Sequence, residues 1–166
     1  MNQEKDKKHL SHRDHIAAIY DDEAEKISQI VPFLKNDLQH DKKCVYFFNS
    51  KTEKEQLEEG FKKMGMSLDY YLSVEQLVYY PVSSLIDDGR INYKSVVSIL
   101  KREHEKFDRG GFGEATLIWD FTDYLNKQDG TVGLLSLEDR LNRYNTVNIK
   151  IICQYNRNTA NPAKLH

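Results

Sequence analysis

The residues best suited to chemistry stand directly after apolar, strand-like runs at five places in the chain. These places are Tyr20-Asp21, Asn49-Ser50, Tyr80-Pro81, Asp120-Phe121-Thr122-Asp123 and Tyr155-Asn156-Arg157. In sheets of parallel strands, ligands collect beyond the carboxyl ends of the strands. We therefore expect these residues to converge on one edge of a sheet and predict a binding site there.

Asp120 ends the apolar run TLIWD, an arrangement by which nucleotide hydrolases hold magnesium. Such a site also needs a phosphate-binding loop. Without one, Asp120 can accept a hydrogen bond from a ligand hydroxyl or amine, bind an arginine, or be an ordinary hydrogen-bonded acid at a strand end. Arg157 is the candidate arginine. It can equally grip a ligand carboxylate or stay solvated at the surface.

The stretch HIAAIYDDEAEKISQIVPFL (15–34) has the strand, loop and helix order in which many α/β proteins bind phosphate. Its loop, Tyr20-Asp21-Asp22-Glu23, contains no glycine and no lysine, which a phosphate loop uses. Carboxylates favour the positive end of a helix. We interpret the loop as a self-capped helix end that disfavours nucleoside triphosphates. The alternative is that these acids are simple caps on an unused edge.

Metal binding and nucleophilic catalysis find little support in the sequence. His12 and His15 are three residues apart, but His15 opens a strand and no cysteine or glutamate completes a tetrahedral set, so we predict no metal site. Neither Cys44 nor Cys153 has a neighbouring histidine, and no G-x-S-x-G motif occurs. We predict no catalytic residue and no cofactor.

Apolar periodicity predicts the elements that position these residues. Strands are expected at 16–20, 43–49, 76–82, 115–121 and 148–156. Helices are expected from Ala24 to Leu38 and at 50–65, 92–107 and 134–144, with a turn at 87–90. Thr52 and Glu55 are spaced as a capping box, and Pro81 should end its strand or lie at an edge. Alternating strands and helices predict an α/β fold with a doubly wound, mainly parallel sheet of about five strands and helices on both faces.

Composition narrows the classes of function. The formal net charge of −2 over 166 residues gives no field that would recruit nucleic acid, and no apolar run is long enough to insert into a membrane. Residues 12–158 are expected to form one domain, with a flexible arm at 1–11 and a tail at 159–166. Two cysteines within apolar runs suit reduced core thiols and a cytoplasmic location.

An ordered set of segments resembles the MEDS sensory domain family, which is named for methanogen and methylotroph regulators. The segments are HIAAIYDDEAEKISQIVPFLKNDLQHDKKCVYFFN, LIDDGRINYKSVVSIL, WDFTDYL, LEDRLNRY and IKIICQYNR, and they run from about His12 to Arg157. His15 and Tyr20 match the family's opening strand. Other matching positions are Asp88, Gly89, Arg90, Leu141, Asn142, Cys153, Gln154, Tyr155 and Arg157.

The resemblance implies a RecA- or KaiC-like domain without a working Walker A loop, used for sensing or signalling, often beside histidine kinases or sigma-factor regulators, and not for catalysis. Relatives tend to carry glutamate and then tryptophan on the fourth strand, where this chain has Asp120 and Asp123. This departure implies a more polar pocket, so a hydrocarbon ligand is not carried over.

These observations favour a non-catalytic, cytoplasmic sensory domain that binds a small organic ligand or a signalling protein, such as a histidine kinase or its regulator. The predicted ligand-binding residues are His15, Tyr20, Asp120, Asp123, Tyr155 and Arg157. One alternative is a divergent nucleotide-binding phosphotransferase or hydrolase that retains Asp120. The other is an interaction module that regulates a kinase without any ligand.

Overall fold

The structure is a computed structural model that describes residues 15–125 and 149–159. The strands of its main sheet are β1 (His15–Tyr20), β2 (Lys43–Phe48), β3 (Leu77–Pro81), β6 (Ala115–Asp120) and β7 (Ile149–Asn156). The helices are α2 (Glu23–Gln39), α3 (Lys51–Lys63), α4 (Asp69–Ser73), η1 (Val82–Leu85), α5 (Tyr93–Gly110) and α6 (Thr122–Leu125). A small hairpin joins β4 (Ile86–Asp87) to β5 (Arg90–Ile91).

The five main strands pair in the order β1-β7-β6-β2-β3, and every pairing is parallel. This confirms the predicted α/β class and parallel sheet. Pro81 ends β3, which lies at one edge of the sheet, as expected of a residue that cannot donate a backbone hydrogen bond. The five strands of the main sheet run in the same direction, so their carboxyl ends lie along the same side of the sheet. We call this side the carboxyl edge.

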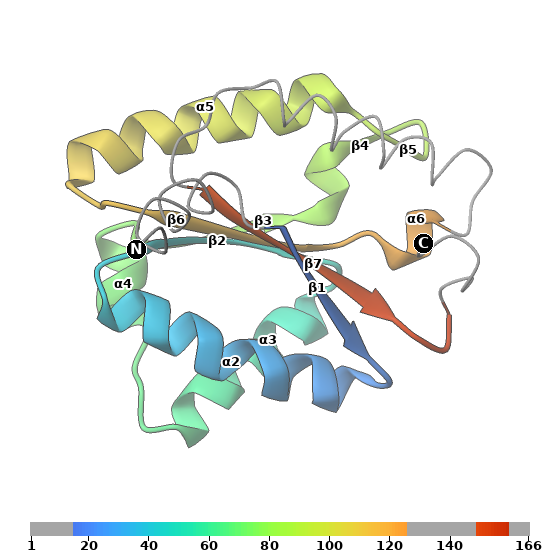
Figure 1. Ribbon diagram of the computed structural model, residues 1–166, viewed down its shortest axis with the longest axis horizontal. Helices are drawn as coiled ribbons and strands as arrows, with labels where there is room; N and C mark the ends of the chain where they lie inside the picture. Colours follow the sequence, from blue (N-terminus) through green and yellow to red (C-terminus); the bar gives the residue numbers. More distant parts are fainter. Residues whose placement is uncertain (1–14, 126–148, 160–166) are drawn as a thin grey trace, which may run out of the picture.

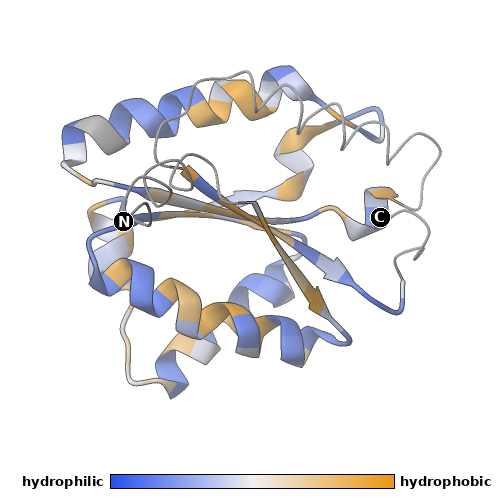
Figure 2. Cartoon of the chain, viewed as in Figure 1, coloured by the Kyte–Doolittle hydropathy of each residue, from blue (hydrophilic) through white to orange (hydrophobic). Residues whose placement is uncertain are grey.

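The helices cover both faces of the sheet, α2 and α3 on one side and α5 on the other (Figure 1). Two separate apolar cores result. One packs α2 and α3 against residues such as Tyr46 and Ile118, and the other packs α5 against Val45 and Trp119. Because side chains of a strand alternate between faces, neighbouring residues of β2 and β6 fall in different cores. Figure 2 shows apolar stretches, interrupted by polar residues, on both α2 and α5, the helices on the two sides of the sheet.

A buried ion pair fastens α5 to the sheet near the amino ends of the strands. The Lys43 ammonium lies 2.8 Å from a carboxylate oxygen of Glu103, and both side chains are almost fully buried. The other carboxylate oxygen of Glu103 accepts a hydrogen bond from the Tyr80 hydroxyl. The Arg102 guanidinium donates to that same hydroxyl at 3.1 Å. A charged group is tolerated in this apolar core because its counter-charge is in contact with it.

Several local predictions need correction or fall outside the described residues. The helix expected at 92–107 extends to Gly110 and ends with Gly111 in the left-handed region at φ 74°. The turn at 87–90 is the β4–β5 hairpin, with Asp88 at φ 50° and Gly89 at φ 71°. The helix expected at 134–144, the arm at 1–11 and the end of the tail lie outside the described ranges. No helix within those ranges combines the length and the apolar character needed to cross a membrane.

Candidate functional site

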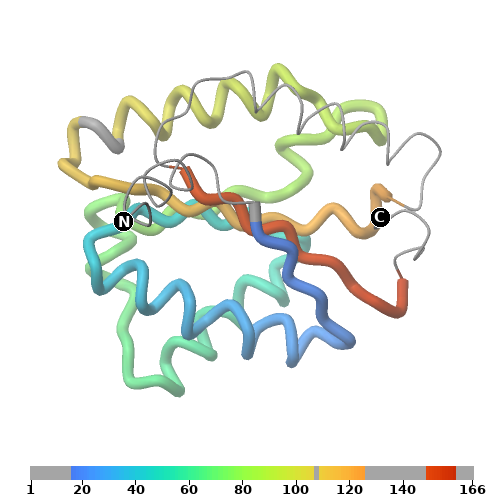
Figure 3. Tube along the Cα trace, viewed as in Figure 1, coloured from blue at the N-terminus to red at the C-terminus, as the bar shows by residue number. Residues whose placement is uncertain are grey.

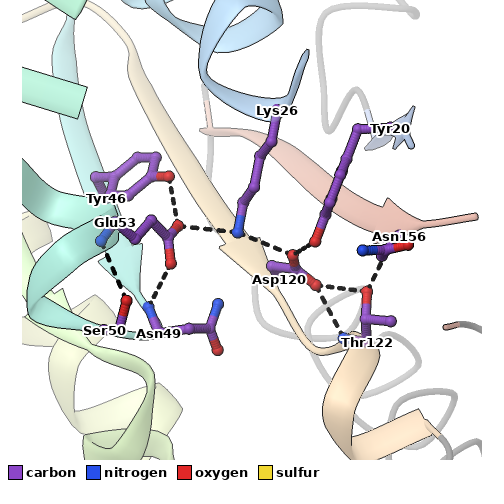
Figure 4. Close-up of polar contacts among 9 residues, drawn as sticks. All are labelled: Tyr20, Lys26, Tyr46, Asn49, Ser50, Glu53, Asp120, Thr122 and Asn156. Carbon is purple, nitrogen blue, oxygen red and sulfur yellow. Dashed lines mark hydrogen bonds and ion pairs between the residues drawn. The ribbon is translucent and has the colours of Figure 1, made fainter. Parts of the chain in front are cut away.

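A lysine and two carboxylates lie buried together at the carboxyl edge of the sheet. The ammonium of Lys26 is 2.9 Å from Oε1 of Glu53 and 2.9 Å from Oδ2 of Asp120 (Figure 4). None of the three residues is more than 4% exposed. Charged side chains are almost never this buried unless they are paired. We call Tyr20, Lys26, Glu53 and Asp120 the buried cluster, because the Tyr20 hydroxyl also donates to Oδ2 of Asp120.

The second oxygen of Asp120 is bound by the start of α6. Oδ1 accepts hydrogen bonds from the Thr122 backbone N–H at 2.9 Å and from its hydroxyl at 2.6 Å. The Thr122 hydroxyl in turn accepts a hydrogen bond from the backbone N–H of Asn156 at 3.0 Å. Both oxygens of Asp120 are therefore engaged, and the β6 end is connected to β7 through Thr122 (Figure 4).

Both carboxylate oxygens of Glu53, on α3, also accept hydrogen bonds from the end of β2 and the residue that follows it. Its Oε1 accepts a hydrogen bond from the Tyr46 hydroxyl at 2.7 Å, and its Oε2 accepts one from the Asn49 backbone N–H at 2.8 Å. The Ser50 side chain caps α3 by accepting from the Glu53 N–H at 3.1 Å. The predicted capping pair of Thr52 and Glu55 is therefore wrong. The helix begins at Lys51, and Ser50 is its N-cap, with Glu53 three residues later.

Four different elements supply the buried cluster, and the topology explains why they meet. Tyr20 ends β1, Asp120 ends β6, and Lys26 and Glu53 stand in the first turns of α2 and α3. Strand β7 lies between β1 and β6, so the Tyr20 side chain must cross it to reach Asp120. Figure 3 shows that the start of α2 follows directly from the end of β1, below the sheet. The site is thus a junction of two helices and two strands.

The charges of the cluster set the protonation of its members. Burial alone would lower the pKa of the Lys26 ammonium, but the neighbouring Asp120 and Glu53 outweigh it and raise that pKa. Lys26 is consequently a cation at neutral pH. Burial and the charge of Asp120 together raise the pKa of Tyr20 well above its usual value, which keeps its hydroxyl a donor. One buried positive charge thus faces two negative ones.

The acidic loop after β1 caps its own helix, as predicted. The Asp22 side chain accepts from the Glu25 N–H at 2.8 Å, and the Glu25 carboxylate accepts from the Asp21 N–H at 2.6 Å. These contacts use backbone N–H groups that a phosphate would otherwise need. The residue after β7 also binds the loop, because Arg157 donates its backbone N–H to the Tyr20 carbonyl at 2.8 Å.

The structure divides the six predicted ligand-binding residues among several places. It brings Tyr20 and Asp120 together. Arg157 is paired with Asp21 at 3.4 Å and is largely exposed, so the alternative in which it binds Asp120 is wrong. Asp123 is exposed at the start of α6. Burial raises the pKa of the nearby Glu23 carboxyl, and the charge of Asp123 makes a smaller contribution in the same direction.

The other two predicted residues do not share the buried cluster. Tyr155 packs against the α5 core, on the opposite face of β7 from Gln154 and Asn156. His15 begins β1, so it stands at the amino edge of the sheet, a strand length away from Tyr20. Because successive side chains of a strand point to opposite faces, the odd-numbered position of Tyr155 indicates the face away from Gln154 and Asn156.

Lys26 and Glu53 are the members of the buried cluster that the sequence interpretation missed. A lysine of a phosphate loop with the pattern G-x-x-x-x-G-K-[ST] stands six residues after the first glycine, and Lys26 stands six residues after Tyr20. Helical spacing offered a second signal. Lys26 is four residues before the buried Ile30, and Glu53 is four before the buried Leu57, so both belong to inward stripes.

Gln154 adds an unpaired polar group beside the cluster. It is 1% exposed and pairs in register with Asp120, so both side chains point to the α2 face. Neither its amide oxygen nor its amide nitrogen has a hydrogen-bond partner among residues 15–125 and 149–159. Within those same ranges, no group of three histidine, cysteine, aspartate or glutamate side chains is placed to hold a metal ion.

Comparison with known proteins places this geometry in context. Residues 14–166 match the model of the MEDS family, described as "MEthanogen/methylotroph, DcmR Sensory domain". No curated protein matches the sequence. Among solved structures, the flagellar accessory protein FlaH from Methanocaldococcus jannaschii is similar with a TM-score of 0.58 at 17% identity, over 93% of this chain and 65% of FlaH.

A KaiC-like protein, PH0186 from Pyrococcus horikoshii OT3, is also similar, with a TM-score of 0.52 at 10% identity. That match covers 87% of this chain and 63% of PH0186, so the chain spans less than two-thirds of either structural neighbour. Both likenesses concern the fold, which is RecA/KaiC-like, as the family resemblance implied.

Proposed function

Because the chain belongs to the MEDS sensory domain family, we propose that it is a non-catalytic, cytoplasmic signalling module that receives a small molecule or a signalling protein at the carboxyl edge of its sheet. The family supplies the sensory role. We further propose that it binds a ligand or a partner and that it has no catalytic activity. The buried cluster is the observation that supports this.

The ion pairs that Lys26 makes with Glu53 and Asp120 argue against phosphoryl transfer at the carboxyl edge. Catalysis of that kind uses a lysine and loop N–H groups to hold phosphates, with an aspartate on the magnesium. Here Lys26 is bound by Glu53 and Asp120, and both oxygens of Asp120 already accept hydrogen bonds. A phosphate group would have to displace a carboxylate from Lys26 and then lie beside it. Like charges at such a distance repel.

The same cluster suits a two-state sensor. It joins two helices and two strands through contacts of fixed geometry, so a ligand or partner that binds one arrangement better shifts the population toward it. Asp123 and Arg157 are exposed at this edge and are the proposed first contacts. Tyr20 and Asp120 are the proposed transmitting residues behind them.

Native mass spectrometry of the protein purified from its own host tests this function. We expect the intact chain to carry a retained small molecule or a co-purified signalling protein, and to carry no nucleotide. The charge-reversed variant Arg157→Glu should lose most of the retained species, whereas Lys62→Glu, an exposed change on α3, should keep it. Retention of ATP or ADP, together with release of phosphate on incubation, would show instead that the nucleotide-dependent alternative is right.

A further inference from the structure

A solvent-accessible groove of about 480 Å³ runs between α2 and α3. Its apolar wall is formed by residues such as Ala24, Ile27 and Val31 of α2 and by Met64, which follows the last residue of α3. This volume falls in the range of sites that bind small organic molecules, which are mostly apolar with a few polar groups. The groove lies alongside the buried cluster but shares none of its four residues.

Gly60 explains why the two helices come so close. A Cβ atom at this position would lie 2.9 Å from Cγ2 of Val31, closer than Cβ atoms come to other atoms, and 3.2 Å from Cγ2 of Ile27, which is tighter than most such contacts. With hydrogen alone at residue 60, the helices approach and the wall of the groove lacks a side chain at that point. The hollow is therefore a product of the helix packing.

Pro32 interrupts the helical hydrogen bonding of α2 where the helix lines the groove. It stands inside α2 and has no N–H, so the carbonyl of Ser28, four residues earlier, loses its usual helical donor. Ser28 and Pro32 both line the groove. The backbone of α2 therefore lacks one i→i−4 hydrogen bond at a residue that lines the groove.

The charges along the groove are unevenly placed. Glu23 stands at the end nearest the buried cluster, Glu59 stands midway along α3, and Lys63 stands one helical turn further on. The carboxylates of Glu53 and Asp120 also raise the pKa of Glu23, after the larger effect of burial and against that of Lys26. This end of the groove therefore has an excess of negative charge that an incoming cation would relieve.

We propose that the α2/α3 groove binds a small organic cation, an amine with a short apolar chain. The ammonium group lies between Glu23 and Glu59 and donates to the Ser28 carbonyl, and the chain lies on Ile27 and Val31. The inference rests on the proposed ligand-binding role but adds a site and a ligand class. A ligand wedged there would also act on the Lys26–Glu53 ion pair, which joins the same two helices.

The test is a titration of the full chain with hexylammonium, followed by amide chemical shifts in NMR. We expect shifts at Ile27, Ser28 and Gly60 and a Kd on the order of 1 mM, from roughly −0.6 kcal/mol per non-hydrogen atom. Hexanol should bind roughly fivefold more weakly because it cannot use the carboxylates. Hexanoate, with the same chain and a negative charge, should bind more weakly still.

Matched variants isolate the charge. Glu59→Gln removes one of the two carboxylates and should weaken hexylammonium binding by roughly twofold, while Glu55→Gln, four residues earlier on α3 and outside the groove, should leave it unchanged. Lys63→Gln should bind at least as well as the wild type. All three side chains are exposed, so folding is not at risk.

Equal binding of hexanoate and hexylammonium, no shifts at the groove, or no effect of Glu59→Gln would overturn the proposal. So would self-association that buries the groove, measured by sedimentation. None of these results bears on retention of a native ligand at the strand edge, which depends on Arg157 and is tested separately.

Discussion

Replacing Lys26 with methionine is expected to lower the free energy of unfolding by about 3–5 kcal/mol, as is usual when one partner of a buried ion pair is removed. The substitution leaves the carboxylates of Glu53 and Asp120 buried beside each other without a cation. Urea unfolding followed by circular dichroism measures the loss. Lys62→Met on α3 is the control, and as an exposed change it should stay within about 0.5 kcal/mol of the wild type.

The dependence of this loss on pH separates charge from packing. The pKa of Lys26 is raised in the folded protein, so its stabilising contribution is complete below the usual lysine value of 10.5 and is lost as the pH rises through the folded value. The gap between wild type and Lys26→Met should therefore be constant near neutrality and shrink under alkaline conditions. A gap that stayed constant throughout would mean that the methionine is simply packed badly.

Glu103→Gln is expected to cost about 3 kcal/mol, because it leaves the buried Lys43 ammonium without a counter-charge in the α5 core. The shape of the side chain hardly changes, so the loss reports charge more than packing. Glu105→Gln, two residues further along α5 and exposed, is the matched control and should be close to neutral. Chemical unfolding of both variants gives the comparison. Equal midpoints for the two would contradict the description of Lys43 as a buried, paired cation.

The two variants also probe different parts of the molecule. Lys26 joins α2, α3 and β6 at the carboxyl edge, whereas Lys43 and Glu103 join β2 to α5 toward the other edge. The sites share no partner, so their effects should add in the double variant within about 0.5 kcal/mol. The sensing proposal concerns only the first.

The architecture was largely readable from the sequence because its signals are local. Apolar runs such as 43–49 and 115–121 predicted strands, and their alternation with helices predicted parallel pairing. The order of the strands was not readable, since it depends on which edges meet in three dimensions. That order places β7 between β1 and β6, which decides that Tyr20 must reach over it to Asp120.

The candidate site was readable only in part. Asp120 and Tyr20 stood out because they end strands, but Lys26 and Glu53 lie within predicted helices and the sequence interpretation assigned them no role. Their burial depends on one another, so the only local signals are the spacing to Ile30 and Leu57 and, for Lys26, its place six residues after Tyr20. Arg157 was correctly assigned to the carboxyl edge of the sheet. Its partner is Asp21, because the chain after β7 turns back onto the acidic loop.

The central claim is that the ammonium of Lys26 is already committed to Glu53 and Asp120 and is not offered to a phosphate. A crystal structure of the protein grown with magnesium and ATP tests this most directly. The account predicts Lys26 still bound by both carboxylates, with no phosphate ordered against residues 20–26. A triphosphate bonded to Lys26 and to the N–H groups at the start of α2 would contradict it.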